Sequence, residues 1–263
     1  MKPFLAELRR RSPALFTLAL IHLAAFVIVA LIAPFDSRTV TGVNPWIKPL
    51  KFLISIAIYT ATAAWLIGDV RASRRTIRII EAIIVVAMLA EIVPIVMQAG
   101  RGVPSHFNIS TAFNRGVFIW MGTFIGINTV AAAALLVLFF VRPKPLPAGY
   151  LWGVRLGLAI FVAGSLEGFV MAARLGHAVG VEDGGPGLPF LNWSVEGGDL
   201  RAAHFFALHS LQALPLAGWL ASRWRPNRPA FQITAVAALA GVWLGAAAIL
   251  FTRALAGMPL LRL

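Results

Sequence analysis

The sequence predicts an all-α, polytopic membrane protein whose chain crosses the bilayer seven times. Of its 263 residues, 59% are hydrophobic and only 13% are charged, and the mean hydropathy is +0.84. Soluble proteins are about 45–50% apolar and about 25% charged, so this composition favours lipid surroundings. Seven apolar runs have the length of about 20 residues that spans ~30 Å of hydrocarbon. They leave no room for a soluble domain, so we expect one transmembrane domain over residues 1–263. The runs cover residues 13–35, 46–68, 76–98, 113–141, 150–174, 199–222 and 230–254.

The first run could be read either as a cleaved signal peptide or as a retained helix. Lys2 and Arg9–Arg11 precede it, as in a signal peptide. However, the run is longer than a usual signal hydrophobic region, and no A-x-A cleavage site follows it. We therefore interpret it as a retained first helix.

The later runs differ in how polar they are. The second, fourth and fifth are plainly apolar in the halves expected on the cytoplasmic side, at residues 57–64, 130–141 and 150–161, whereas the third and sixth each contain a proline, Pro94 or Pro215. Each proline leaves a backbone carbonyl without its helical donor, beside a polar side chain. The seventh run carries Gly241 and Gly245, a small-x-x-x-small stripe that fits another helix or a second copy in a homo-oligomer.

The net charge of +13 is explained mainly by topology. If the N-terminus is cytoplasmic, 14 of the 23 basic residues but only 3 of the 10 acidic residues fall on the cytoplasmic side. This bias is the one that orients bacterial membrane proteins, and it places the C-terminus outside. It also removes the main reason to expect a nucleic-acid partner. Cysteine is absent, which excludes disulfides, thiolate metal sites and cysteine nucleophiles.

Charged and polar residues within the runs gather toward the outer side. Glu91 and Gln98 are seven residues apart, about 20° from each other around a helix, and Glu167 and Arg174 repeat this spacing. The sixth run starts with a wide polar stripe that we expect to face the bundle interior or a wet cavity. Charges in a membrane interior are expensive and indicate function by default. The stripe contains Asp199, Arg201, His204, His209 and Gln212.

Three stretches of the chain, QAGRGVPSHFN, GGPGLPFLNWS and GDLRAAHFFALHSLQALP, together with TGVNPWIKPLKF, resemble a family of bacterial seven-helix integral membrane proteins. The resemblance covers nearly the whole chain. It implies a multi-pass protein of the bacterial inner membrane, and it carries over no activity and no functional residue.

The first functional hypothesis is a membrane enzyme with an outward-facing site. Two glutamates and two histidines suit a divalent metal or an acid–base pair; these are Glu91, Glu167, His204 and His209. Nearby basic and amide groups would hold a small anionic or lipid-like ligand. They are Lys48, Lys51, Arg101, His106, Asn108, Arg115, Arg174, Asn192, Arg201 and Gln212. The bland alternative pairs the two glutamates with arginines as structural ion pairs.

Two other hypotheses stay open. His22 and His209 lie at compatible depths on different helices, so they could be axial ligands of haem b in a cytochrome. A proton-coupled transporter would need a polar route to both faces, for which the cytoplasmic side offers only Glu81 and Asn128. No H-E-x-x-H or G-x-S-x-G motif selects a reaction.

Overall fold

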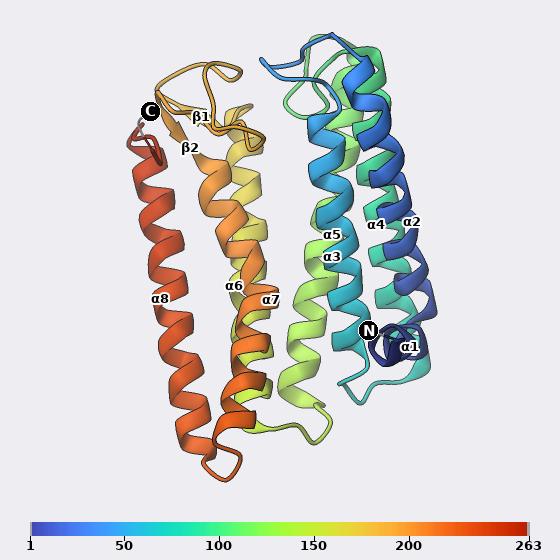
Figure 1. The fold of residues 1–263 in the computed structure, drawn as a ribbon, viewed down its shortest axis with the longest axis vertical. Coiled ribbons are helices and arrows are strands. Elements are labelled where there is room, and N and C mark those ends of the chain that lie inside the picture. Colours follow the sequence, from blue (N-terminus) through green and yellow to red (C-terminus); the bar gives the residue numbers. More distant parts are fainter. Residues whose placement is uncertain (1, 262–263) are drawn as a thin grey trace.

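The computed structural model describes residues 2–261 and is a bundle of long helices (Figure 1). Its helices begin and end within three residues of the expected apolar runs. A ten-residue helix that the apolar runs do not include, α1, precedes them. The elements are α1 (Lys2–Arg11), α2 (Pro13–Ile32) with a 3₁₀ turn (Ala33–Phe35), α3 (Ile47–Ile67), α4 (Arg74–Arg101), α5 (Ala112–Val141), α6 (Ala148–Arg174), β1 (Ala178–Val179), β2 (Gly198–Asp199), α7 (Leu200–Trp224) and α8 (Pro229–Leu255).

Six of these helices are long and apolar enough to cross a membrane, namely α2 with its 3₁₀ turn, α3, α4, α5, α6 and α8. The helix α7 is 25 residues long and packs against both α6 and α8, but it does not reach the same apolarity. The lower apolarity of α7 is due to the polar stripe in its first half.

The outward-facing side chains of the bundle are apolar: Leu31, Val130 and Val242 each expose two thirds or more of their surface. Such extensive apolar exposure indicates contact with lipid.

Local signals set the helix boundaries. Ser12 separates α1 from α2: its hydroxyl accepts from the backbone N–H of Leu15, and Pro13 occupies the first helical position. Ser73 and Thr111 cap α4 and α5 in the same way. Such caps satisfy backbone donors that the first helical turn leaves unpaired.

The bundle has two ends that differ in their connections (Figure 1). At one, called here the loop end, lie residues 36–46, 102–111 and 175–199, with the short β1–β2 pair. At the other, the turn end, lie α1 and the short connections 68–73, 142–147 and 225–228. The helices α2–α5 form one group and α6–α8 a second, which contacts the first mainly through α5 and α6.

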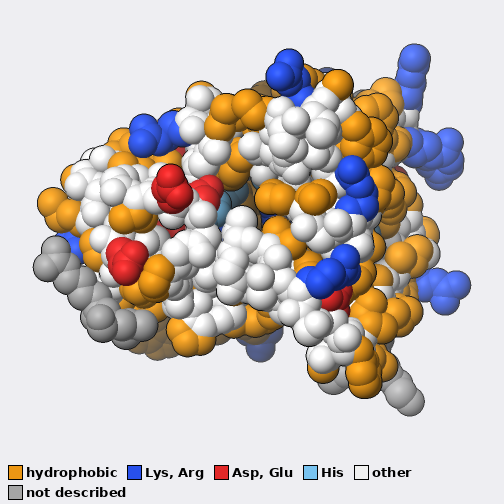
Figure 2. Space-filling view, turned by 90° about the horizontal axis from the view of Figure 1, so that it is seen from above, with side chains coloured by type: hydrophobic (Ala, Val, Ile, Leu, Met, Phe, Trp, Pro, Cys, Tyr) orange, Lys and Arg blue, Asp and Glu red, His pale blue; other side chains and the backbone are white. Residues whose placement is uncertain are grey.

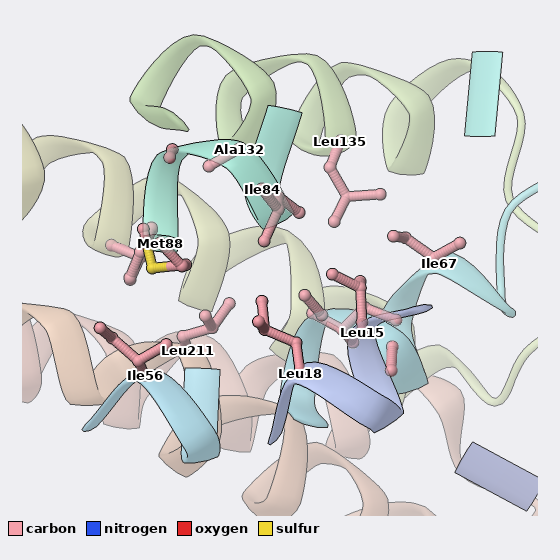
Figure 3. Packing of buried hydrophobic residues seen from close by; sticks show 14 of the residues in the cluster. Leu15, Leu18, Ile56, Ile67, Ile84, Met88, Ala132, Leu135 and Leu211 are labelled. Carbon is pink, nitrogen blue, oxygen red and sulfur yellow. The ribbon is translucent and has the colours of Figure 1, made fainter. Parts of the chain in front are cut away.

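A continuous apolar core joins the two groups. Leu15, Ile56 and Ile84 lie in it from α2, α3 and α4, and Leu211 reaches it from α7 (Figure 3). Within the second group, α6 and α7 approach closely at glycines. A Cβ atom on Gly218 would lie 2.1 Å from the carbonyl oxygen of Gly149. Small residues are what allow helix backbones in a membrane to approach this closely.

Candidate polar site at the loop end

The first part of the candidate site is a buried carboxylate, Glu91, on α4. Only 4% of the residue is exposed, and its Oε2 atom has no hydrogen-bond partner among the described residues. His106, in the loop between α4 and α5, places its Nε2 atom 4.0 Å from this oxygen. A buried polar atom without a partner is uncommon and marks a place where chemistry or binding is expected.

His106 is held by Lys48, the second residue of α3. The Lys48 Nζ atom donates to His106 Nδ1 over 3.0 Å, and the hydroxyl of Ser105 lies 3.2 Å from the same nitrogen. Because Nδ1 accepts, we assign the ring proton to Nε2, the nitrogen that faces Glu91. Burial, together with the charges of Lys48 and His177, holds the pKa of His106 well below its usual range. The imidazole is therefore neutral at pH 7.

A second polar cluster surrounds His177, just after α6. Its Nδ1 atom lies 2.9 Å from Asp183 Oδ1 and 3.9 Å from Asp199 Oδ2. Burial opposes ionisation of Asp183, but His177 and two backbone N–H groups outweigh it and lower the pKa of this carboxyl to about 2. The ring of Phe107 contacts His106 and His177, with centroid distances of 5.9 and 6.2 Å. It thereby joins the two clusters.

Arg201 uses most of its donors within the protein. Its guanidinium donates to both carboxylate oxygens of Asp199, over 2.9 and 2.6 Å, and also to the backbone carbonyl of Asn192. Asp199 in turn caps the N-terminus of α7. The basic group therefore stabilises a helix end and the loop before it, and few of its donors remain for a ligand.

Seen from above the loop end, the surface is hollowed near its centre, and a histidine lies beside acidic side chains in the hollow (Figure 2). Lys51 reaches across from α3 and donates to the carbonyl of Leu191 over 3.0 Å. Asn192 donates to the carbonyl of Thr41 over 3.1 Å. These two bonds connect the 175–199 loop of the second helix group to the first group.

The structure does not bring Glu167 and the α7 histidines into one visible cluster with Glu91. Glu167 lies on α6, which packs against α5, α7 and α8, whereas Glu91 lies on α4, which packs against α2, α3 and α5. Glu167 is half-buried, with Oε1 unpartnered among the described residues. His204 Nδ1 is 2.8 Å from the Gly164 carbonyl, and His209 Nδ1 is 2.7 Å from that of Phe205.

The remaining predicted ligand-binding residues are either bonded to other parts of the protein or exposed. Arg101 donates to Gln98 and Asn114, and Gln212 donates to Thr62 of α3 over 3.1 Å. Asn108 bonds only within its own loop. Arg115 and Arg174 are exposed.

Neither the metal hypothesis nor the haem hypothesis gains support. Within residues 2–261, no group of three or more His, Asp or Glu side chains is placed to hold a metal ion. His22 is buried on α2, among α1, α3 and α4, and its Nδ1 atom lies 2.8 Å from the Leu18 carbonyl. His209 lies on α7, in the other helix group.

Two members of the polar site, His177 and Asp183, were missing from the sequence-based set of site residues, and Asp199 was predicted only as part of the polar stripe of the sixth run. Asp199 was available as a signal, since an aspartate just before a long helix is a typical N-cap. Asp183 lies in a glycine-rich loop whose path the sequence does not specify.

Comparisons of the chain with protein-family models, curated proteins and solved structures find no match.

Proposed function

We propose that the chain is a seven-span membrane protein that binds a small anionic or lipid-like substrate at its loop end and acts on it by acid–base chemistry. One observation carries the proposal: the unpartnered Oε2 of buried Glu91, 4.0 Å from a neutral histidine that Lys48 holds in place. Glu91 would be the acid or base. His106 and Lys48 would orient it and balance charge.

The proposed topology places the N-terminus and the turn end in the cytoplasm of a bacterium and the loop end outside. It is supported by the basic residues of the connections, since Arg71, Arg74 and Arg142 all lie at the turn end. The proposed seventh span is α7, which packs beside α6 and α8 like the apolar helices around it. Its polar residues would face the protein rather than lipid.

Lys48 and Lys51 are the groups best placed to bind an anion. Each ammonium has three donors, and each uses one in a direct bond within the protein, to His106 or to the Leu191 carbonyl. Both belong to the first turn or two of α3, where the helix dipole also favours negative charge. A phosphate or carboxylate bound there would lie beside the buried Glu91.

Short-chain phosphatidic acid is a direct probe of this proposal. We expect it to raise the thermal midpoint of the detergent-solubilised protein, and Lys48→Gln to remove most of that rise. Glu91→Gln should keep this rise in thermal midpoint but should no longer turn over the anionic lipid, a reaction that phosphorus NMR follows. Glu81→Gln, on the same helix near the turn end, is the matched control. A fully active Glu91→Gln protein would show that the site is assigned wrongly.

A proton-coupled transporter is the second candidate, and contacts at mid-depth favour it. The Tyr59 hydroxyl donates to Asn128 over 3.0 Å, and Gln212 donates to Thr62. These polar contacts could continue a route from the loop end toward the turn end. Proton flux into proteoliposomes, read with an internal pH dye, should fall in Asn128→Leu if the route is used. Equal flux in empty vesicles would exclude it.

A further inference from the structure

The short helix α1, at the turn end, is fixed to the bundle on one side only. The helix α1 lies across the base of the bundle rather than along it (Figure 1). One side of α1 is fixed: Leu8 is buried in the core, and Phe4 stacks on Trp65 with centroids 5.2 Å apart. Arg11 donates to Asp69 over 2.7 Å and to the Trp65 carbonyl over 2.6 Å.

The contacts around Asp69 form a clamp that sets the direction of α1. Asp69 is buried, and it also accepts from the Tyr150 hydroxyl over 2.8 Å. Trp65 Nε1 donates to the same hydroxyl, so α1, α3 and α6 meet at this point. The position of α1 on the bundle is therefore determined by buried, charge-assisted bonds.

The other sides of α1 are open and amphipathic. Leu5 is apolar and exposes 41% of its surface, and Phe4, although its ring stacks on Trp65, still exposes 51%. Arg9 lies one turn from Leu5, about 40° away around the helix, and both Arg9 and Arg10 are exposed. Exposed apolar groups beside arginines on a helix that lies flat are the signature of an interfacial helix.

Further arginines surround α1 at the turn end. On α1, the start of α4 and the connections 68–73 and 142–147, the arginines that are exposed and form no salt bridge within residues 2–261 are Arg9, Arg71, Arg74, Arg75, Arg78 and Arg142. Two of the nearby acids are already used, since Glu7 pairs with Arg10 and Arg11, and Asp69 pairs with Arg11. Glu81, one turn after Arg78 on α4, forms no salt bridge in the described part of the chain. One carboxylate beside six arginines leaves this surface with a net positive charge.

We propose that α1 and the surrounding arginines form a binding surface for anionic phospholipid headgroups of the leaflet at the turn end. Phe4 and Leu5 insert at the level of the acyl chains, and Arg9, Arg74 and Arg75 contact the headgroup phosphates. Attraction of this kind adds up with each arginine near a charged surface. The surface is distinct from the loop-end site and does not depend on its function.

Depth of insertion is the first test, because the chain has no native cysteine to interfere. Leu5→Cys is labelled with an environment-sensitive fluorophore in nanodiscs of phosphatidylcholine, with or without phosphatidylglycerol. Ala6→Cys, about 100° away around α1, is the matched control. We expect the Leu5 label to be blue-shifted and shielded from iodide, more so with phosphatidylglycerol, and the Ala6 label to remain aqueous. Identical emission and quenching at both positions would overturn the proposal.

Lipid selectivity is the second test. Phosphatidylglycerol is titrated into the detergent-solubilised Lys48→Gln protein, the parent in this test, because this substitution weakens the proposed anion site at the loop end; the thermal midpoint is the readout. The triple variant Arg9→Gln, Arg74→Gln, Arg75→Gln should bind roughly a hundredfold more weakly than the parent. Removing three exposed arginines at the turn end of the other helix group (Arg223→Gln, Arg225→Gln, Arg228→Gln) should change binding little. Equal loss in both triple variants would show general charge attraction and refute a specific surface.

Discussion

The contact between α6 and α7 predicts a sharp difference between glycines that look alike in the sequence. Gly218 on α7 faces the backbone of α6: an added Cβ would lie 2.1 Å from the Gly149 carbonyl oxygen and 3.0 Å from the Tyr150 Cα atom. Gly241 and Gly245 on α8 have no atom within 4 Å of the same position. The substitution Gly218→Ala should therefore disrupt packing, whereas Gly241→Ala should not.

The magnitude follows from the geometry. A Cβ atom needs about 3.2 Å from a backbone oxygen, so Gly218→Ala must move the helices apart by about 1 Å, and the obstructing atoms are backbone that cannot rotate away. Overpacking of this kind costs about 1–3 kcal/mol. The better helix propensity of alanine offsets up to ~1 kcal/mol of this cost. In Gly241→Ala only that favourable contribution remains.

Thermal unfolding in a mild detergent, followed by tryptophan fluorescence, measures the difference. We expect the Gly218→Ala midpoint to fall by several degrees, with Gly241→Ala and Gly245→Ala at or above the parent value. If Gly218→Ala were as stable as Gly241→Ala, α6 and α7 would not be in backbone contact there. The reasoning from close approach would then be refuted.

Two further predictions concern charged groups at the ends of the bundle. Asp69→Asn removes one of the two carboxylates that pair with the largely buried Arg11 guanidinium, the other being Glu7, and the loss of this charge-assisted bond should cost about 2 kcal/mol of unfolding free energy. Tyr150→Phe removes one bond to the Asp69 carboxylate and should cost about half as much, and equal midpoints for both variants would contradict the clamp. The pKa of His106 is held below its ordinary value of 6.5 in the folded protein, so below pH 6.5 the unfolded chain takes up more protons than the folded chain. His106 therefore leaves the stability of the folded protein unchanged above pH 6.5 and lowers it as the pH falls below that value. The midpoint of His106→Gln should fall less than that of the parent between pH 7 and pH 5, and parallel curves would exclude this role.

The apolar runs predicted the long helices well because burial in lipid requires an uninterrupted length of apolar residues. They did not predict α1, since a ten-residue amphipathic segment is too short to span a bilayer and depends on tertiary contacts such as Phe4 on Trp65. The polar stripe of α7 was found, but the stripe alone does not say which helix it faces.

The candidate site was predicted in pieces. The sequence indicated Glu91, Lys48 and His106 separately, as a buried acid, a ligand-binding lysine and a loop histidine, and the fold brings them into one chain of contacts. Seven-residue spacing placed Glu167 on a helix face, but spacing within one helix cannot show which other helix lies opposite. The partners of His177 depend on a long loop, whose path is set by contacts with several helices.

The bonds of the 175–199 loop to the first helix group imply a measurable minor population. Two side-chain bonds, Lys51 to Leu191 and Asn192 to Thr41, tie this loop to that group. A charged donor contributes about 1.5–3 kcal/mol and a neutral one about 0.5–1.5 kcal/mol. Breaking both therefore costs about 2–4.5 kcal/mol, which corresponds to roughly 0.05–3% of molecules with the loop detached at any instant. Molecules in that state would present Lys48 and Glu91 more openly, so exchange of a bound ligand would depend on how often the loop detaches.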